Sequence, residues 1–262
     1  MNRYNINLFL LIIMISFICI NLAHSDQKED MIIGKNETNG DNLSMDDQSS
    51  DSNIIKLPAP QYDSNTSVEQ ALLNRRSIRS FSDESITLND LSQLLWAGYG
   101  ITKKLDKPDF VRGGLKTAPS AGALYPLEHY VIVRNVSGLA NGIYRYNPES
   151  HSIEREKSGS YIRKLSEASY GQSMLEECAA IIAITAFYER TVSKYGERGR
   201  DRYVCMDAGH SAQNIYLQAY SLKLGLTVCG AFNDESVAKT LDLQPKETPL
   251  YLIPIGHPAT NK

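Results

Sequence analysis

The chain has 262 residues, of which 42% are hydrophobic and 22% are charged, with a formal net charge of −3. This composition is typical of a globular protein and excludes a collagen-like, low-complexity or wholly disordered chain. The charge is uneven, because residues 26–56 carry a net charge of −5 and residues 57–262 a net charge of +1. A near-neutral body lacks the basic face that nucleic-acid binding requires, so we expect no nucleic-acid partner.

The first 25 residues have the pattern of an export signal. Arg3 precedes an apolar run over 8–20, and the small residues Ala23 and Ser25 follow it. This pattern predicts a signal peptide over 1–25, and therefore an exported or extracytoplasmic protein. The alternative is an uncleaved membrane anchor, although residues 8–23 fall short of the roughly 20 apolar residues that span a bilayer comfortably.

Residues 26–56 are rich in Asp, Asn, Ser and Gln and contain no aromatic residue. Such a segment cannot bury enough surface to offset its chain entropy, so it is predicted to be a disordered acidic linker before a domain over 57–262. Three of the four cysteines lie in this domain and none forms a CxxC pair, which excludes a disulfide scaffold. The five histidines have no metal-ligand spacing, so no metal site is expected.

Helical and strand patterns alternate through the domain. Ser67 and Gln70 form a capping box, and Thr87 caps a second helix that Gly98 and Gly100 end. Residues 101–118 are expected to be a polar loop. The predicted helices cover 67–75, 87–100, 161–169, 203–224 and 235–241, and the predicted strands cover 129–134, 143–146, 151–156, 179–186, 226–232 and 251–255. Hairpin and crossover connections are mixed, which favours an α+β fold over a doubly wound sheet.

The densest candidate site is the run Arg75, Arg76, Ser77 and Arg79. Alternate residues of an extended chain share a face, so Arg75, Ser77 and Arg79 would form a cradle for phosphate and hydroxyl groups. The alternative is a solvated basic patch at a helix C-terminus.

Two further stretches carry possible chemistry. The loop over 119–126 places small residues between prolines, which lets its backbone approach a large flat ligand, or is an ordinary strand entry. Lys194 and Tyr195 follow a buried strand and could act as an acid/base pair if the lysine is desolvated, although such a pair usually belongs to a surface loop. Gly209–Gln213 departs from a hydrolase nucleophile elbow, because Gln213 stands where that motif needs glycine.

These stretches resemble the nitroreductase superfamily of flavin enzymes and, more narrowly, the SagB/ThcOx-type dehydrogenases. The resemblance covers about residues 57–258, and its motifs occur in the order of the family. The matching stretches are RRSIRSF at 75–81, PSAGALYPLE at 119–128, Gly142–Tyr146, KYGERG at 194–199, DAGHSAQN at 207–214, TVCGAF at 227–232 and PIGHP at 254–258.

The resemblance implies a mixed β-sheet flanked by helices, in an obligate homodimer with FMN at the interface. It implies that FMN is held by the residues Arg75, Arg76, Ser77, Arg79, Ser120, Gly122, Gln213, Gly230 and Ala231. It also implies that Lys194 and Tyr195 remove a proton from an azoline ring of a peptide while hydride leaves for flavin N5. For this role we expect the pair to be shielded from bulk water.

Other functions compete with this one. An NAD(P)H-dependent nitro or quinone reductase would use the same cofactor, and a flavin-binding module could have kept the fold without turnover. The predicted signal peptide disfavours both enzymatic functions, because peptide-modifying partners and nicotinamides are cytoplasmic. A plain structural domain without flavin is the remaining alternative.

Overall fold

The structure is a computed structural model that describes residues 53–259. The expected signal peptide over 1–25, and the expected linker as far as residue 52, lie outside the described residues. The helices are α2 (Val68–Asn74), α3 (Leu88–Tyr99), α4 (Ile162–Ala168), α5 (Met174–Glu177), α6 (Glu189–Tyr195), α7 (Val204–Ser221) and α8 (Asp234–Leu241). The strands are β1 (Ile54–Lys56), β2 (Ile101–Lys104), β3 (Gly114–Lys116), β4 (Leu127–Val133), β5 (Gly142–Asn147), β6 (Ser152–Ser158), β7 (Ala180–Phe187), β8 (Gly225–Leu226) and β9 (Glu247–Gly256).

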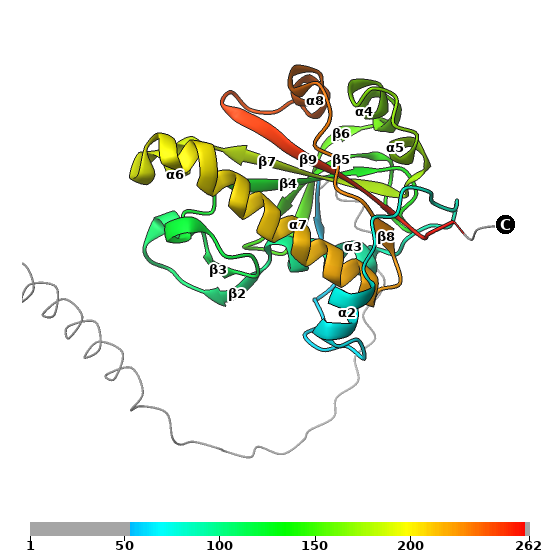
Figure 1. Ribbon diagram of the computed structural model, residues 1–262, viewed down its shortest axis with the longest axis horizontal. Coiled ribbons are helices and arrows are strands. Elements are labelled where there is room, and N and C mark those ends of the chain that lie inside the picture. The colour runs from blue at the N-terminus through cyan, green and yellow to red at the C-terminus, as the bar shows by residue number, and fades with distance from the viewer. Residues whose placement is uncertain (1–52, 260–262) are drawn as a thin grey trace, which may run out of the picture. The chain divides into compact units, whose positions relative to one another are not determined.

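A seven-stranded sheet runs in the order β1-β6-β5-β4-β7-β9-β8 and separates two layers of helices (Figure 1). On one face α3 and α7 pack against β4 and β7 through residues such as Leu94, Ile215 and Ile182. On the other face α4, α5 and α8 close a second core that includes Leu165 and Val237. The central strand β7 is buried on both faces, as its continuous apolar run predicts. The expected α+β fold is therefore confirmed.

The local signals at the first two helices are also confirmed. Ser67 and Thr87 accept hydrogen bonds from the backbone N–H groups of Gln70 and Asp90, and both helices begin with a complete capping box. The second helix ends at Gly100, so Gly98 lies inside it. A Cβ atom on Gly98 would stand 2.9 Å from the Ile215 side chain, which lets α3 approach α7 closely.

Residues 101–118 are not the polar loop that the sequence predicts. They form the antiparallel pair β2–β3, with a short 3₁₀ turn between the strands. Lys116 explains the error, because this charged residue is 7% exposed and its ammonium donates to the carbonyls of Val111 and Arg112. The same ammonium lies over the rings of Tyr99 and Tyr125. A polar sequence therefore contributes to a buried structure here.

Three other expectations are corrected at the edges of the sheet. Residues 54–56 of the expected linker form β1, which pairs with β6. The strand expected over 226–232 is reduced to β8, and only a single bridge from Cys229 to Leu252 follows it. The strand pairs of the described sheet are all antiparallel, and parallel pairing, which the expected mixed sheet would contain, is limited among residues 53–259 to isolated bridges from Ser77 to Leu226 and from Ile86 to Val136.

The sequence predicts a loop around Lys194 and Tyr195, but both residues lie in the last turn of α6. A π-helical turn over Gly199–Tyr203 then leads into α7. Within residues 53–259, no helix is long and apolar enough to cross a membrane.

Candidate functional site

The loop over 119–126 is fastened to the first turn of α7 by one buried carboxylate. Asp207, which is 3% exposed, accepts hydrogen bonds from Ser120 Oγ at 2.5 Å and from the backbone N–H of Ala121 at 3.3 Å. Burial raises the pKa of the Asp207 carboxyl, although both hydrogen bonds act in the opposite direction. Ser120 Oγ also accepts from the backbone N–H of Tyr125, which closes the loop on itself. The result is a compact turn around Gly122, whose φ of +63° suits glycine.

The side chains of Lys194 and Tyr195 converge on Gly122. A Cβ atom on this glycine would stand 2.7 Å from Tyr195 Oη and 3.0 Å from Lys194 Nζ. The Tyr195 ring is held edge-on against Tyr203, with ring centroids 5.0 Å apart. The fold therefore brings together the predicted acid/base pair and the predicted flavin-facing loop, which lie about 70 residues apart in the sequence.

The expected shielding of this pair is not found within the described chain. Tyr195 is half-buried, but Lys194 is exposed. Any cover for the ammonium must therefore come from outside residues 53–259.

The arginine run meets the other half of α7. Ser77 Oγ lies 2.9 Å from the hydroxyl of Tyr216, and the Arg75 guanidinium stacks over the same ring at 5.2 Å. The Tyr216 hydroxyl also accepts from the backbone N–H of Val228 at 3.2 Å. Arg75 and Ser77 thus share a face, as predicted, and Tyr216 joins them to the segment that leads to Gly230.

The other two arginines behave differently from Arg75. The Arg76 guanidinium donates to the carbonyls of Leu73 and Arg75, so it satisfies the C-terminal end of α2. Arg79 is exposed. Among residues 53–259 neither Arg75 nor Arg79 forms an ion pair with a carboxylate. Their charges are therefore available to an anionic ligand.

The remaining predicted cofactor residues have exposed positions. Gly230 and Ala231 lie beyond the bridge from Cys229, and the carbonyl of Ala231 accepts a hydrogen bond from Gln172. Gln213 points outward from α7, between the two ends of the candidate site.

The long helix α7 sets the distance between the two halves of the candidate site. Asp207 holds the Gly122 loop and Tyr216 holds the arginine run, and nine residues of helix separate them by about 13 Å. Guanidiniums at one end and the turn around Gly122 at the other suit a ligand with a phosphate and a flat ring. These residues therefore fit FMN.

Sequence reasoning missed the residues that connect these parts. Asp207 lies in the quoted DAGHSAQN stretch but was assigned no role, and a carboxylate at the start of a helix was the available signal. Tyr216 had no signal beyond its place in a helical pattern, because its partners come from residues 75–77 and 228.

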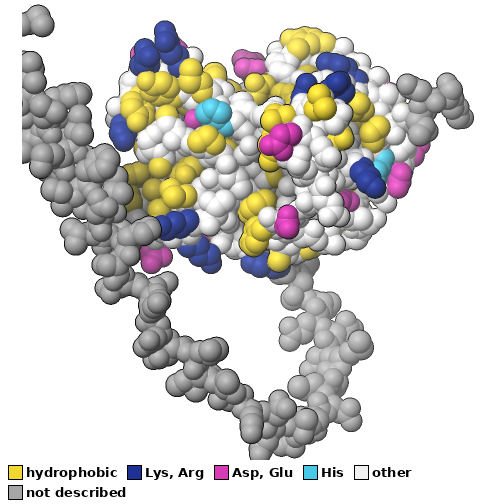
Figure 2. Space-filling view, turned by 60° about the horizontal axis from the view of Figure 1, so that its bottom comes forward, with side chains coloured by type: hydrophobic (Ala, Val, Ile, Leu, Met, Phe, Trp, Pro, Cys, Tyr) yellow, Lys and Arg dark blue, Asp and Glu magenta, His cyan; other side chains and the backbone are white. Residues whose placement is uncertain are grey.

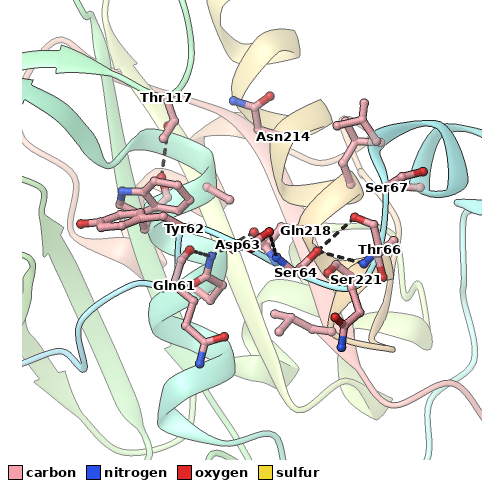
Figure 3. Close-up of a pocket in the computed structure, with 18 of the residues that line it drawn as sticks. Gln61, Tyr62, Asp63, Ser64, Thr66, Ser67, Thr117, Asn214, Gln218 and Ser221 are labelled. Carbon is pink, nitrogen blue, oxygen red and sulfur yellow. Dashed lines mark hydrogen bonds between the residues drawn. The ribbon is translucent and has the colours of Figure 1, made fainter.

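A separate hollow of about 940 Å³ lies between the segment 61–68, α3 and the second half of α7 (Figure 3). Gln93 on α3 donates to the carbonyl of Gln61 and to Gln218 on α7, so it joins the three walls. Tyr62 stacks at an angle on Trp96, with centroids 5.3 Å apart, and is 80% exposed. The predicted catalytic and cofactor residues do not line this hollow.

The described residues contain no cluster of three or more His, Cys, Asp or Glu side chains arranged to hold a metal ion. The features of the site are thus a convergent Lys–Tyr pair, a glycine turn and a group of free guanidiniums, mounted on an α+β scaffold. These features lie along α7.

Residues 72–257 match the model of the nitroreductase family, and this chain belongs to that family. A nitroreductase-family protein of Methanocaldococcus jannaschii, MJ1384, is 44% identical over 189 residues, which are 72% of this chain and 90% of the relative. The chain is therefore an oxidoreductase of the nitroreductase family.

Three other proteins are similar to part of this chain or share its fold. The microcin B17-processing protein McbC of Escherichia coli is 30% identical over 135 residues, a match that spans about half of each chain. A solved nitroreductase-family structure from Ralstonia eutropha has a TM-score of 0.68 at 27% identity and covers 80% of this chain and 91% of that one. The E. coli microcin synthetase McbBCD complex shares the fold, with a TM-score of 0.59 at 22% identity over 90% of this chain and 80% of that one.

Proposed function

We propose that this chain is an FMN-dependent dehydrogenase of the SagB/ThcOx type, and that it oxidises azoline rings in peptides. The observation that carries the proposal is the convergence of Lys194 Nζ and Tyr195 Oη on Gly122. The match to a microcin-processing protein supports a peptide substrate. Bound FMN would supply the two-electron acceptor, which no side chain can provide.

The chain's own residues would divide the remaining work. Arg75, Arg79 and Ser77 would bind the phosphate and ribityl end, because guanidiniums form strong charge-assisted hydrogen bonds with phosphate. Ser120 and Gly122 would present backbone to the ring. Gly230, Ala231 and Gln213 would contact the cofactor from the far end of the site and from α7.

Lys194 and Tyr195 would handle the proton. The neutral Lys194 amine would accept the proton from one azoline ring carbon, and a hydride from the adjacent ring carbon would go to the bound flavin. The electron pair left by the proton would form the new double bond of the ring. The Tyr195 hydroxyl is then placed to donate a hydrogen bond to the substrate or to orient it. Bound ligand and substrate would cover Lys194, which is exposed among residues 53–259.

The same proposal includes a homodimer. On α2 the apolar side chains of Val68, Leu72 and Leu73 are 62%, 54% and 72% exposed, and Met206 on α7 is 53% exposed. The face turned to the viewer in Figure 2 shows several separate hydrophobic patches, with scattered Lys, Arg, Asp and Glu side chains among them. Exposed apolar helix faces of this kind are typical of protein interfaces. We also propose that residues 1–25 export the chain, or anchor it in a membrane if they are not cleaved.

The test begins with the purified full chain. We expect a flavin absorption spectrum, and release of FMN on denaturation. A thiazoline-containing peptide mixed anaerobically should bleach the flavin, and Lys194→Ala or Tyr195→Phe should slow this step by about 10² to 10⁴, the usual size of an acid/base contribution.

The alternatives give different results. Bleaching by NADH or NADPH, but not by the peptide, identifies a nitro or quinone reductase. Bound flavin that no donor reduces identifies a flavin-binding module, and a colourless protein contradicts the proposal altogether.

A further inference from the structure

Glu128, on β4, is a buried carboxylate surrounded by three guanidiniums. It is 4% exposed, and its Oε1 accepts from Arg112 and Arg190 at 2.6 Å each, while its Oε2 lies 3.2 Å from Arg145. Burial by itself would raise the pKa of the Glu128 carboxyl, but the three arginines outweigh it and lower this pKa. Glu128 is therefore ionised at neutral pH and binds three different parts of the fold.

Two of these guanidiniums also hold the end of the Gly122 loop. Arg112 donates to the carbonyl of Tyr125 at 2.8 Å, and Arg190 donates to the carbonyl of Pro126 at 3.3 Å. These carbonyls lie three and four residues beyond Gly122. Arg112 and Arg190 thus bind both the Glu128 carboxylate and the end of the Gly122 loop.

Arg190 connects this cluster to the Lys–Tyr pair. It stands four residues before Lys194 on α6, so the two side chains lie on the same face of the helix with a rise of about 6 Å. The helix has seven residues, no side-chain N-cap hydrogen bond, and Thr191 as its buried residue. So short a helix has little stability of its own. The contacts of Arg190 with Glu128 and with the carbonyl of Pro126 are therefore among those that hold this helix in place.

We propose that Glu128 and Arg190 are positioning residues, which fix α6 so that Lys194 and Tyr195 meet the Gly122 loop. This role rests on the proposed function of Lys194 and Tyr195 in proton transfer. In this role the ion pair between Glu128 and Arg190 affects where the Lys194 and Tyr195 side chains lie, in addition to any effect on the stability of the fold. Arg145 binds the same carboxylate but comes from β5 and makes no hydrogen bond to the loop among the described contacts.

Arg145 therefore provides the matched control. Arg190→Gln and Arg145→Gln each remove one guanidinium of similar exposure, 28%, from the same carboxylate. We expect similar losses of thermal stability from the two variants. We expect only Arg190→Gln to slow flavin reduction at saturating thiazoline peptide, by about 10- to 100-fold, because small misplacements of reacting groups have effects of this size. Arg190→Lys should restore part of the rate, and flavin content should not change.

A second readout reports the position of Lys194 without turnover. Reductive ¹³C-methylation gives a dimethyl-lysine NMR signal for each lysine, and the Lys194 signal is assigned by its loss in Lys194→Arg. We expect this signal to move in Arg190→Gln and in Glu128→Gln, and to stay in place in Arg145→Gln. If Glu128→Gln does not fold, Arg190→Gln still tests the positioning role, because the Arg190 side chain is partly exposed and its replacement should be tolerated.

The outcomes separate the two proposals. If Lys194→Ala keeps the wild-type rate, the proton-transfer role fails, and the Lys194 signal alone decides whether Arg190 positions this side chain. If Lys194→Ala is slow while Arg190→Gln keeps both the wild-type rate and the wild-type signal, the positioning role is wrong. Equal loss of rate in Arg145→Gln would also overturn it, since the cluster would then act on stability alone.

Discussion

The Lys194 ammonium lies 3.0 Å from the point that a Cβ atom on Gly122 would occupy. Lys194 belongs to α6 and Gly122 to the loop before β4. Two buried carboxylates hold these segments: Asp207 binds the loop, and Glu128 binds Arg190 of α6. Glycine at 122 therefore serves two needs, a left-handed backbone and room for the ammonium.

Replacing this glycine should disturb the site. Gly122→Ala would place a methyl group against Tyr195 Oη and Lys194 Nζ, so we expect flavin reduction to slow by about 10- to 100-fold. Gly138→Ala is the control, because Gly138 also has a positive φ, +76°, but nothing within 4 Å of its Cβ position. It should cost about 1 kcal/mol of stability and leave the rate unchanged. Stopped-flow traces that are the same for both variants would contradict the placement.

The free guanidiniums should govern cofactor affinity. Removing one charge-assisted phosphate contact costs about 1.5–3 kcal/mol, so Arg75→Ala and Arg79→Ala should each weaken FMN binding roughly tenfold or more. Arg76→Ala should have a smaller effect, because this guanidinium donates to carbonyls at the end of α2. Fluorescence titration of the apoprotein with FMN measures the constants. Arg163→Ala, on an exposed turn of α4, is the control, and affinity equal to that control in Arg79→Ala removes Arg79 from the site.

The exposed apolar face of α2 should control the oligomeric state. Leu73 is 72% exposed, and Leu73→Asp would place a charge in the proposed dimer interface, so we expect it to shift the protein toward monomers at micromolar concentration. Tyr170, 74% exposed in the connection between α4 and α5, offers the control variant Tyr170→Asn, which should remain dimeric. Light scattering decides between these states. A monomeric wild-type protein with FMN bound would end the dimer proposal.

Acid should destabilise the fold through His129. This side chain is 1% exposed, its Nε2 lies 2.8 Å from Ser211 Oγ, and burial is the main cause that lowers its pKa to about 3. Between pH 6.5 and 3 the unfolded chain binds a proton there that the folded chain does not, so stability increases with pH across this window. Below pH 6.5 each unit should cost up to about 1.4 kcal/mol.

Urea midpoints measured from pH 7 down to pH 4.5 test this dependence on pH. His129→Gln can still pair with Ser211 but does not titrate, and its midpoint should fall less steeply with acid. A slope equal to that of the wild type would assign the acid sensitivity to other groups.

Much of the fold could be predicted from local patterns. The capping boxes at Ser67 and Thr87, the apolar run of β7 and the hairpin of β5 and β6 depend on residues within a few positions of one another. Each was confirmed with small shifts in its ends. The segment over 101–118 and the length of the strand that begins at Leu226 were predicted wrongly, because their structure depends on distant partners. Lys116 is buried by the rings of Tyr99 and Tyr125, and after Leu226 a single bridge from Cys229 to Leu252 joins the segment to the sheet.

By itself the sequence determined which residue types are available for the chemistry: the arginine run, the glycine turn and the Lys–Tyr pair, in the order of a known family. Only the tertiary structure decided which of them meet. Asp207 and Tyr216 on α7 place the turn and the arginines at two ends of one helix, and Glu128 fastens α6 beside the turn. The physical reason is that buried hydrogen bonds and ion pairs join residues far apart in the chain, and no local pattern encodes their partners.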